Sequence, residues 1–514
     1  MQQVATLSRP RPSTDEPGRP RPRAISRGLA AVGVMFVFSA AACSRDTASS
    51  DERTRSPIAT DDALAREFDG SYPISVAASG RVREFTITAA PSTIEILEGR
   101  PMEVWAYNGQ VPGPTLRITL GDTLRVHFFN RLEQATTIHW HGVRLPNAMD
   151  GVPGVTQDAV PPGGSFLYEF TPKDAGTFWF HPHIRSSEQV ERGLFGVLIV
   201  EEPDPTPFSR ELVWVLDDWL LNRDGTLVED FVTRHDLAHD GRWGNVLTMN
   251  GVPTPSVPVH PGERLRIRLI NVANGRVFDP GFVGLPADTI AMDGMSLPES
   301  VRPSSLDFAP GNRVDLDVTI PLDAVGRTLE FRDHFARQQP LLARLVVSGE
   351  PAAPPTGTIA RGSVPTWSGA AALEPSLELR LNARAGGPYG LEWTINDKIM
   401  RHETAESAST AHERHDAVYR LTIGRFAKLR FTNESARLHP MHMHGVFFKV
   451  LARDGVAVDE PAWRDTVLLR GRQTIDVGMV PLDEGDWMLH CHILEHAESG
   501  MMTLVHVGSE RGHR

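Results

Sequence analysis

Ten of the twenty histidines in this chain fall into four short clusters. Side chains two positions apart on a β-strand point to the same face, so a His-x-His pair can present two imidazoles to one metal ion. A single pair is more typical of hydrogen-bonded core histidines, but four clusters in one chain predict a metal centre. The clusters are His139-Trp140-His141, His181-Pro182-His183, His439-Pro440-Met441-His442-Met443-His444, and His490-Cys491-His492 with His496.

The last cluster predicts two sites from one short stretch. Strand alternation sends His490 and His492 to one face and Cys491 to the opposite face. A thiolate with two imidazoles and a weak axial thioether forms a blue-copper electron-transfer centre, and the soft sulfur favours copper over harder ions. We therefore expect Cys491, His439 and His496 to form the trigonal ligand set of such a centre.

The axial ligand of this centre is predicted to be Met501, ten positions after Cys491. The alternative for Met501 is core packing beside Met502. Structural zinc needs paired cysteines or a closed set of four ligands. The only other cysteine, Cys43, lies in a very different context, so zinc and a shared disulfide are both disfavoured.

The elements that must position these residues are short strands. The chain has 514 residues, with 44 glycines and 40 prolines, which favours many strands joined by turns. Domains usually hold about 100 to 200 residues, so this length predicts three of them. The net charge of −12, with no block of lysine and arginine in the folded part, excludes the electrostatic footprint of a nucleic-acid binder.

A pattern that recurs three times indicates that the three domains are similar. Each copy begins with Asn-Gly or Asn-Asp, continues through alternating apolar and polar residues with a glycine turn between them, and closes on an asparagine. The first asparagines are Asn108, Asn250 and Asn396, which lie 142 and 146 residues apart (250 − 108 and 396 − 250), and the closing ones are Asn130, Asn271 and Asn433. Such alternation is typical of β-sandwiches, so we predict an all-β fold of three consecutive sandwiches.

The composition also predicts the boundaries of these units. Residues 44–65 have almost no aromatic or β-branched side chains and cannot form a packed core, so we expect a linker. The predicted order is an export signal over 1–43, a polar linker over 44–67, domains over 68–204, 205–350 and 371–510, and a stiff proline-containing linker over 351–370.

The N-terminal residues resemble an export signal. Three arginines between residues 21 and 27 precede an apolar run over 28–38 and the small residues 39–42. Cys43 then completes a stretch that resembles a bacterial lipobox, so lipidation of Cys43, simple cleavage, and an unmodified cysteine in a discarded peptide all remain open. We expect an exported protein of the periplasm or cell envelope that meets a membrane only through a lipid at Cys43.

In this order, the four clusters resemble the motifs of the multicopper oxidase family of laccases and bacterial copper oxidases. The resemblance covers nearly all of the chain after about residue 68, and the stretch from Asn108 to Pro114 also resembles the first domain of that family. It implies three cupredoxin-like Greek-key sandwiches and four copper ions: one type 1, one type 2 and two type 3. It also implies a ligand set by position: His139 and His442 for type 2, His141, His181 and His492 for one type 3 ion, and His183, His444 and His490 for the other.

The resemblance further implies an enzyme that takes single electrons from a reducing substrate and reduces dioxygen to water. The candidate substrates are phenols and aromatic amines, cuprous ion, or manganese. An envelope protein that stores copper or acts as a scaffold with little turnover is the alternative. A copper nitrite reductase would leave His181 and His183 without a role, because it needs no type 3 pair.

Oxygen reduction consumes protons, so an acid is expected near the cluster. Asp150 matches the acidic residue that follows the first His-x-His-Gly motif in bacterial members, although alone it reads as an ordinary Asp-Gly turn. Those members also often carry a glutamate directly after the last histidine ligand, where this chain has Ala497. Glu498, the next residue, is the candidate substitute. A shift of one residue along the chain changes the direction in which the side chain points.

The remaining histidines match none of the four motifs. The chain has no methionine-rich insertion; instead residues 400–416 contain His402, His412 and His415, which indicate either a copper-collecting loop or an ordinary polar loop. We interpret the others as structural or surface residues: His127, His235, His239, His260, His334, His506 and His513.

Overall fold

The computed structural model describes residues 60–69, 71, 75–204, 207–353, 355–401 and 419–509. The predicted export signal with Cys43, and nearly all of the histidine-containing stretch 400–416, lie outside the described residues. All elements given below belong to the unit formed by residues 57–514. Within the described part, no helix is both long and apolar enough to cross a membrane.

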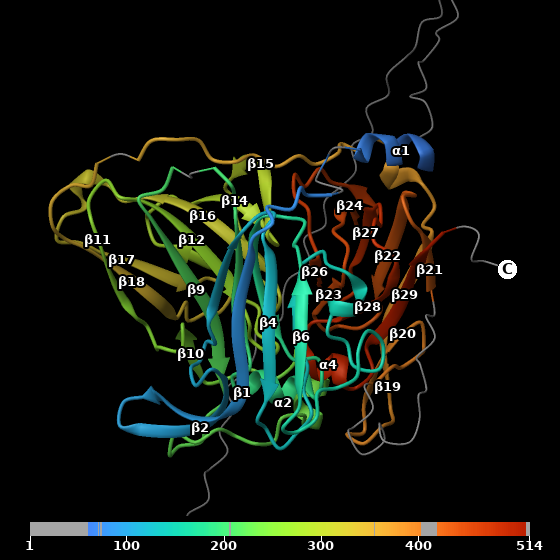
Figure 1. Ribbon diagram of the computed structural model, residues 1–514, viewed down its shortest axis with the longest axis horizontal. Coiled ribbons are helices and arrows are strands. Elements are labelled where there is room, and N and C mark those ends of the chain that lie inside the picture. The colour runs from blue at the N-terminus through green and yellow to red at the C-terminus, as the bar shows by residue number, and fades with distance from the viewer. Residues whose placement is uncertain are drawn as a thin grey trace, which may run out of the picture. The chain divides into compact units, whose positions relative to one another are not determined.

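Six sheets arranged as three pairs make up the fold (Figure 1). The first pair uses residues 82–201. One sheet has the order β2-β1-β4-β6 and the other β3-β8-β7-β5. These strands are β1 (Val82–Leu97), β2 (Arg100–Tyr107), β3 (Thr115–Thr119), β4 (Thr123–Asn130), β5 (His139–His141), β6 (Ser165–Phe170), β7 (Gly176–His181) and β8 (Gly196–Glu201).

The second pair uses residues 210–347, with the orders β10-β9-β12-β16-β14-β15 and β11-β18-β17-β13. Its strands are β9 (Arg210–Trp219), β10 (Val246–Met249), β11 (Ser256–Val259), β12 (Arg264–Asn271), β13 (Pro280–Phe282), β14 (Asp288–Met292), β15 (Met295–Val301), β16 (Arg313–Thr319), β17 (Thr328–Asp333) and β18 (Leu341–Val347).

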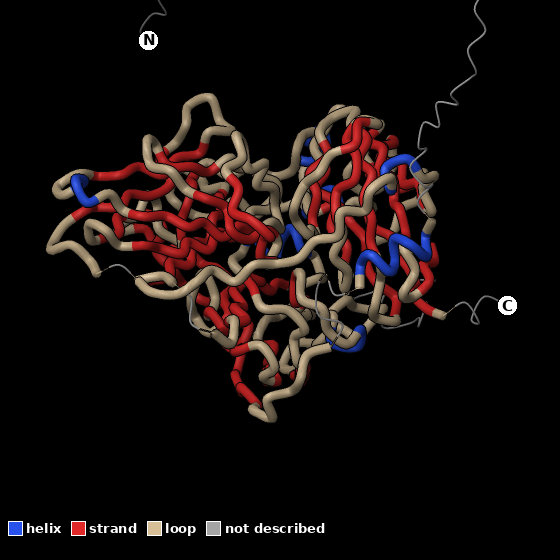
Figure 2. Tube along the Cα trace, turned by 90° about the horizontal axis from the view of Figure 1, so that it is seen from above, coloured by secondary structure: helices blue, strands red, loops and turns tan. Residues whose placement is uncertain are grey.

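The third pair uses residues 377–508, with the orders β20-β19-β22-β27-β24-β25 and β21-β29-β28-β23-β26. Its strands are β19 (Leu377–Arg384), β20 (Glu392–Ile395), β21 (Tyr419–Thr422), β22 (Ala427–Asn433), β23 (His439–Met443), β24 (Lys449–Arg453), β25 (Val456–Ala457), β26 (Thr466–Leu469), β27 (Thr474–Met479), β28 (Gly485–Cys491) and β29 (Met502–Gly508). Strands dominate the trace in Figure 2, and the all-β prediction is confirmed.

Each pair encloses its own apolar core, because alternate residues of its strands point inward. In β4, for example, Leu124, Val126 and Phe128 are fully buried, whereas the residues between them are partly exposed. They pack with buried residues of the partner sheet, including Leu198 and Val200 of β8. Buried residues of the second and third pairs form equivalent cores.

The threefold repeat seen in the sequence corresponds to a tight turn that recurs once in each sandwich and is held by the side chain of an asparagine. Asn108, Asn250 and Asn396 all have positive φ, with values of 55°, 53° and 50°, which asparagine tolerates in tight turns. In each copy the side-chain oxygen accepts a hydrogen bond from a backbone N–H of an earlier strand, and the side-chain amide donates to a carbonyl two residues before it. These partners are Thr88 and Thr86, Val215 and Val213, and Arg380 and Glu378.

The strand pairing repeats in the same way. The first strand of each pair runs parallel to the strand that ends at the closing asparagine: β1 with β4, β9 with β12, and β19 with β22. The second sheets repeat a parallel contact as well, between β3 and β8, β11 and β18, and β21 and β29. The three sandwiches therefore share these central pairings, although their sheets differ in the number of strands.

Helices are few and short: α1 (Asp61–Phe68), α2 (Ser186–Glu191), α3 (Arg234–Ala238) and α4 (Leu494–Glu498), with single 3₁₀ turns η1 (Asn147–Met149), η2 (Leu322–Ala324) and η3 (Ala370–Ala372). Helix α1 corrects the prediction of a linker that continues to residue 67. Leu64 and Phe68 lie four positions apart on one helix face and are 2% and 1% exposed, and Phe68 contacts the rings of Trp367 and Trp463. These two apolar residues anchor the polar stretch together with hydrogen bonds from Trp367 N to Glu67 Oε1 at 2.6 Å and from Trp367 Nε1 to Leu64 O at 3.0 Å.

Candidate copper centres

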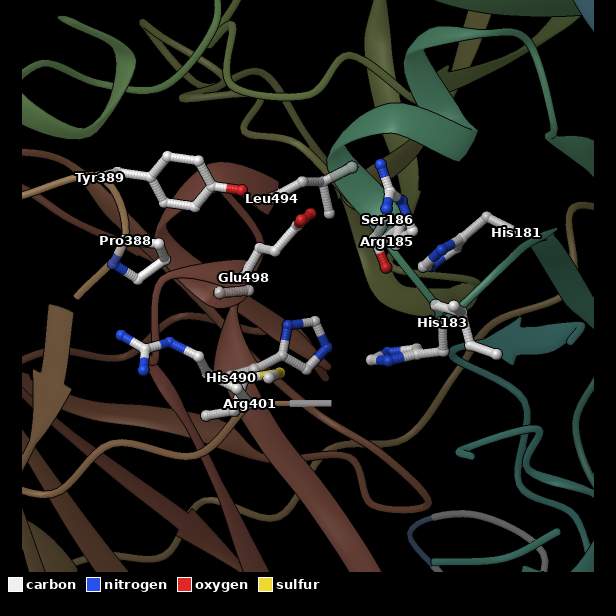
Figure 3. Close-up of a pocket in the computed structure, with 13 residues that line it drawn as sticks. His181, His183, Arg185, Ser186, Pro388, Tyr389, Arg401, His490, Leu494 and Glu498 are labelled. Atoms are coloured by element: carbon white, nitrogen blue, oxygen red, sulfur yellow. The ribbon is translucent and has the colours of Figure 1, made fainter. Parts of the chain in front are cut away.

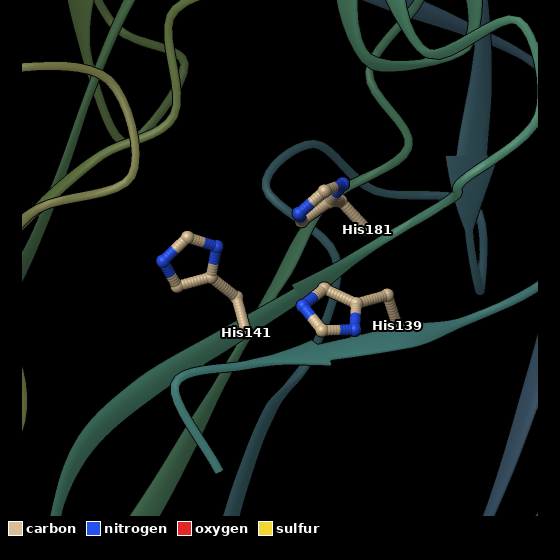
Figure 4. Close-up of side chains that lie close together, drawn as sticks. All are labelled: His139, His141 and His181. Carbon is tan, nitrogen blue, oxygen red and sulfur yellow. The ribbon is translucent and has the colours of Figure 1, made fainter. Parts of the chain in front are cut away.

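The first two histidine clusters meet because β5 and β7 pair antiparallel. Their register places His139 opposite His181, so imidazoles from neighbouring strands share one face of the sheet. Figure 4 shows the rings of His139, His141 and His181 pointing toward a common space. Ring nitrogens of these three residues lie within 4.8 Å of one another.

The last two clusters also meet through antiparallel strand pairing, in the third sandwich. Strands β23 and β28 pair antiparallel, with His442 opposite His490 and Met441 opposite Cys491. Alternation then places His442 and His490 on one side of the sheet and Cys491 on the other, as the sequence predicts.

Eight histidines from the first and third sandwiches converge into one buried cluster, each at most 3% exposed. The rings of His139 and His444 stack with centroids 3.8 Å apart, as do those of His141 and His442. The full set is His139, His141, His181, His183, His442, His444, His490 and His492.

Backbone carbonyls fix which nitrogen of several rings faces the cluster. The Nδ1–H groups of His139, His181 and His490 donate to Asp150 O, Pro182 O and Cys491 O at 2.9, 3.0 and 2.9 Å. Each of these hydrogen bonds leaves Nε2 as the inward-facing nitrogen. Such outer contacts hold the orientation and tautomer of metal-binding histidines.

The electrostatics of the cluster suit a metal ion. Burial lowers the pKa of His141, His181, His442, His444 and His492, so these imidazoles are neutral at ordinary pH and offer lone pairs. The buried Nε2 atoms of His139, His181 and His442 and both ring nitrogens of His492 have no hydrogen-bond partner among the described residues. Buried polar atoms without partners are costly, and metal ions bound at this space would satisfy them.

Asp150 is the predicted acid, and it lies directly against this cluster. It is 1% exposed; its Oδ2 accepts a hydrogen bond from His444 Nδ1 at 2.7 Å, and its Oδ1 lies 3.2 Å from His139 Nδ1. One carboxylate therefore orients a histidine from the first sandwich and one from the third. Gly151, with φ of 79°, permits this close approach, because a Cβ there would lie 1.9 Å from Ile138 O.

Asp465 plays a similar part that the sequence analysis missed. Its carbonyl accepts a hydrogen bond from His442 Nδ1 at 2.9 Å, and its Oδ1 lies 3.3 Å from His141 Nε2. Although burial opposes ionisation, Arg313 and the hydrogen bonds of Asp465 hold the pKa of its carboxyl below the usual range. Arg313 comes from the second sandwich and donates to both carboxylate oxygens at 2.9 and 2.6 Å. No local motif marks either residue.

A second site lies on the opposite face of β28. Cys491 Sγ is 3.6 Å from His439 Nδ1 and 3.9 Å from His496 Nδ1, and the two nitrogens are 3.3 Å apart. All three side chains are fully buried. Burial raises the pKa of the Cys491 thiol and lowers the pKa of both histidines, that of His496 to about 3. A thiolate is stable here only beside a bound cation, which the two neutral imidazoles help to hold.

The far nitrogens of these two rings are held by the protein. Ser435 Oγ lies 3.0 Å from His439 Nε2, and His496 Nε2–H donates to His239 O at 2.9 Å. Met501 is fully buried in the same apolar core as Cys491, whose N–H donates to Met501 O at 3.1 Å. The axial role of Met501 stays a prediction.

A cavity of about 140 Å³ reaches the eight-histidine cluster from outside. His181, His183 and His490 form part of its wall, together with Arg185, Arg401 and Glu498. Figure 3 shows Glu498 pointing into this space, with His181 and His183 across from it. Glu498 Oε2 accepts a hydrogen bond from Ser187 N at 3.3 Å, and burial raises the pKa of its carboxyl. Ala497 packs instead with Val152 and Met502.

An all-histidine cluster between two β-sandwiches, with a cysteine site one peptide bond away, defines a copper protein of the cupredoxin type. Two family models, both described as "Multicopper oxidase", match residues 88–205 and 390–511. The multi-copper oxidase from Pseudomonas thermotolerans has a solved structure that is 32% identical, with a TM-score of 0.73; the match covers 84% of this chain and all of that one.

Curated relatives agree. "Multicopper oxidase MmcO" of Mycobacterium tuberculosis is 29% identical, over 93% of this chain and 95% of that protein. "Copper resistance protein A" of Pseudomonas syringae pv. tomato is 33% identical over 54% of this chain and 53% of its own length. The chain belongs to the multicopper oxidase family. It is an oxidoreductase with copper as cofactor, and it couples one-electron oxidation of a reducing substrate to the four-electron reduction of dioxygen to water.

Proposed function

We propose that the eight-histidine cluster holds three copper ions in the arrangement that the family resemblance implies. His183, His444 and His490 form one of the groups whose ligand atoms lie within 4.8 Å, which supports their sharing a type 3 ion. His141, His181 and His492 are assigned to the other type 3 ion, and His139 and His442 to type 2. The ring centroids of His141 and His492 are 4.9 Å apart, and those of His139 and His442 are 5.9 Å apart.

Cys491, His439 and His496 are proposed to hold the type 1 ion, with Met501 as its axial ligand. Bound copper supplies the one-electron redox steps and the reduction of dioxygen. The protein supplies a fixed, water-poor path between the two sites, because Cys491 is joined by single peptide bonds to His490 and His492. Dioxygen reaches the cluster through the cavity beside His183.

We propose that the reducing substrate is cuprous ion rather than a bulky phenol or aromatic amine. The observation that carries this proposal is that both type 1 imidazoles are fully buried, with their far nitrogens bonded to Ser435 and His239. A large aromatic ring therefore has no ligand edge to contact, whereas a small ion needs only a docking site nearby. The similarity to the relative named "Copper resistance protein A" also supports cuprous ion as the substrate.

Oxygen uptake by the copper-loaded enzyme tests this substrate. We expect kcat/KM for cuprous ion to exceed that for 2,6-dimethoxyphenol, with a high KM for the phenol. Equal or faster turnover of the phenol at low concentration would contradict the proposal.

Two carboxyl groups are proposed to serve the oxygen-reducing cluster. Asp150 orients His139 and His444, and its predicted role in proton supply stays a prediction. Glu498 is proposed to deliver protons through the cavity, in place of the glutamate that Ala497 lacks.

A pH profile of Glu498→Gln checks the second role. Because the pKa of Glu498 is raised, its carboxyl stays protonated to higher pH than an ordinary glutamate and loses its proton as pH rises through that raised value. Wild-type turnover should fall over that range, whereas the variant should be slower by about 100-fold and lose this step in its profile. Unchanged turnover and an unchanged profile in the variant would remove Glu498 from the proton path.

Finally, we propose that the three sandwiches are separate domains over 68–204, 205–350 and 371–510, with 351–370 between the last two, and that α1 belongs to the folded body. We also propose export to the periplasm or cell envelope, either with a lipid at Cys43 or by simple cleavage. The support is the arginine-preceded apolar run over 28–38. Labelling with a radioactive fatty acid distinguishes the two forms of export, since only the first incorporates label at Cys43.

A further inference from the structure

A short segment of the second sandwich lies against the cysteine-containing site of the third. This cover segment (residues 233–243) contains α3 and connects β9 to β10. His239 O accepts the hydrogen bond from His496 Nε2, and Asp240 Oδ1 accepts one from Leu438 N, beside His439, at 2.9 Å. The cover segment therefore contacts the cysteine-containing site at His496 and next to His439.

Further contacts hold the cover segment in place. Arg242 N donates to Glu495 Oε2 at 3.0 Å, and Trp393 Nε1 donates to Leu237 O at 3.0 Å. Within the segment, Thr233 and Asp236 form a reciprocal capping box that starts α3. The position of α3 over the site is therefore fixed by contacts with the third sandwich.

Two exposed histidines stand on this segment. His235 lies in α3 and His239 directly follows its last residue, and their ring centroids are 4.2 Å apart. His239 Nδ1–H donates to His235 O at 2.8 Å, which fixes that ring and leaves its Nε2 for another partner. Within the described residues, no hydrogen bond or ion pair holds the ring of His235. Both are surface residues, as the sequence analysis interprets them.

The surrounding charge is mixed. Asp236 and Asp240 lie on the segment, as do Arg234 and Arg242. Burial raises the pKa of Glu495, which contacts the segment, to about 8, so this carboxyl is largely neutral near pH 7. Two imidazoles form a sufficient ligand pair for a monovalent copper ion, which accepts low coordination numbers and nitrogen ligands.

We propose that His235 and His239 bind the cuprous substrate ion, and that its electron passes through the backbone of His239 and the hydrogen bond from its carbonyl to His496. This inference rests on the proposed cuprous oxidase function. In each step one cuprous ion loses one electron and leaves as cupric ion. Four such ions supply the four electrons that, with four protons, convert one dioxygen to two water molecules.

The experiment compares copper-loaded wild type, His235→Gln/His239→Gln, and the matched control His260→Gln/His334→Gln, which removes two exposed histidines elsewhere in the second sandwich. Ag(I), which cannot be oxidised by the enzyme, is titrated calorimetrically as a probe of the site. Other histidines also bind Ag(I), so the comparison uses the difference between proteins. We expect the first variant to bind one Ag(I) ion fewer than the wild type and the control.

Oxygen uptake provides the second measurement, with cuprous ion and with ferrocyanide, a donor that needs no metal-binding side chain. The ratio of kcat/KM for cuprous ion to that for ferrocyanide should fall at least about tenfold in the first variant, the lower end of what loss of even an outer contact costs a metal site. The control should keep the wild-type ratio.

The possible failures are separable. Wild-type Ag(I) binding or a wild-type kinetic ratio in His235→Gln/His239→Gln would overturn the site while leaving the proposed function intact. If wild type does not oxidise cuprous ion at all, yet the variant loses one Ag(I), the proposed substrate fails and the metal-binding pair stands.

Discussion

At the scale of single residues, the histidine cluster depends on a glycine from the sandwich that supplies none of its ligands. Gly311 has φ of 90° and precedes β16; a Cβ there would lie 2.9 Å from His141 Cε1 and 3.0 Å from His492 Cδ2. Both rings are proposed ligands of one type 3 ion. The absence of a side chain at this position therefore makes room for the cluster.

Gly311→Ala should displace both rings and lower the copper content of the cluster, with turnover reduced by about 10-fold to 100-fold. Copper per chain by atomic absorption and oxygen uptake measure the two effects. Gly326→Ala is the control, because Gly326 also has positive φ, 77°, but nothing within 4 Å of its would-be Cβ. Equal losses in both variants would point to backbone strain instead of the contact with the rings.

Asp150 permits a second test at this scale. The carboxylate of Asp150 accepts a hydrogen bond from His444 and lies beside His139. Asp150→Asn retains the shape of the side chain but replaces this carboxylate with a neutral amide. Turnover should therefore fall by about 10-fold to 100-fold. Asp486→Asn is the matched control, since Asp486 accepts a hydrogen bond from His506 Nδ1 at 2.8 Å away from the cluster. Full activity in Asp150→Asn would show that this contact does not matter.

At the scale of elements, β28 serves both sites because its two faces differ. Cys491→Ser should remove the intense blue absorption and lower turnover at least about 1,000-fold, since the hydroxyl is a poor ligand for copper. The eight cluster histidines lie on the other face and should keep their three ions, measurable by copper analysis and electron paramagnetic resonance. Normal oxidation by a variant with a full cluster would refute the electron path through Cys491.

The elements also show what a sequence can reveal. Period-two alternation predicts that His139 and His141, or His490 and His492, share a face, and the strands bear this out. The contacts of Asp465 and Arg313 escape prediction because they join residues 152 positions apart in different sandwiches. Likewise, the apolar face of α1 consists of only Leu64 and Phe68, and the cover segment reaches His496 through a backbone carbonyl, which no side-chain pattern encodes.

At the scale of the whole molecule, the second sandwich supplies no proposed ligand of the copper cluster. It positions residues of the first and third sandwiches, which supply the ligands. Arg313 fixes Asp465 beneath the histidine cluster, and the cover segment fixes α4 and His496. Buried carboxyl groups accumulate beside this junction. Asp217 of β9 is 8% exposed, and Glu191 of α2 is 6% exposed and pairs with Arg242. These groups make the stability of the assembly depend on pH.

Burial, followed by the charges of Asp218 and Glu191, raises the pKa of Asp217. The unfolded chain releases the proton of Asp217 near pH 4, whereas the folded chain keeps it to higher pH. Folding is therefore disfavoured as pH rises through this interval, by about 1.4 kcal/mol for each unit between the two values. Glu191, whose pKa is raised to about 7 by burial, adds to the same trend.

Asp217→Asn should remove the contribution of Asp217, because a neutral amide has no proton to lose. In thermal unfolding, the variant should exceed the wild type in Tm at pH 8, and the gap should shrink or reverse at pH 4. Asp218→Asn is the control: Asp218 accepts from Arg276 Nε at 2.6 Å, so its loss should lower Tm at both pH values. If the Tm difference between Asp217→Asn and the wild type is the same at both pH values, Asp217 ionises normally in the folded chain. Any loss of wild-type stability toward alkaline pH then has another origin.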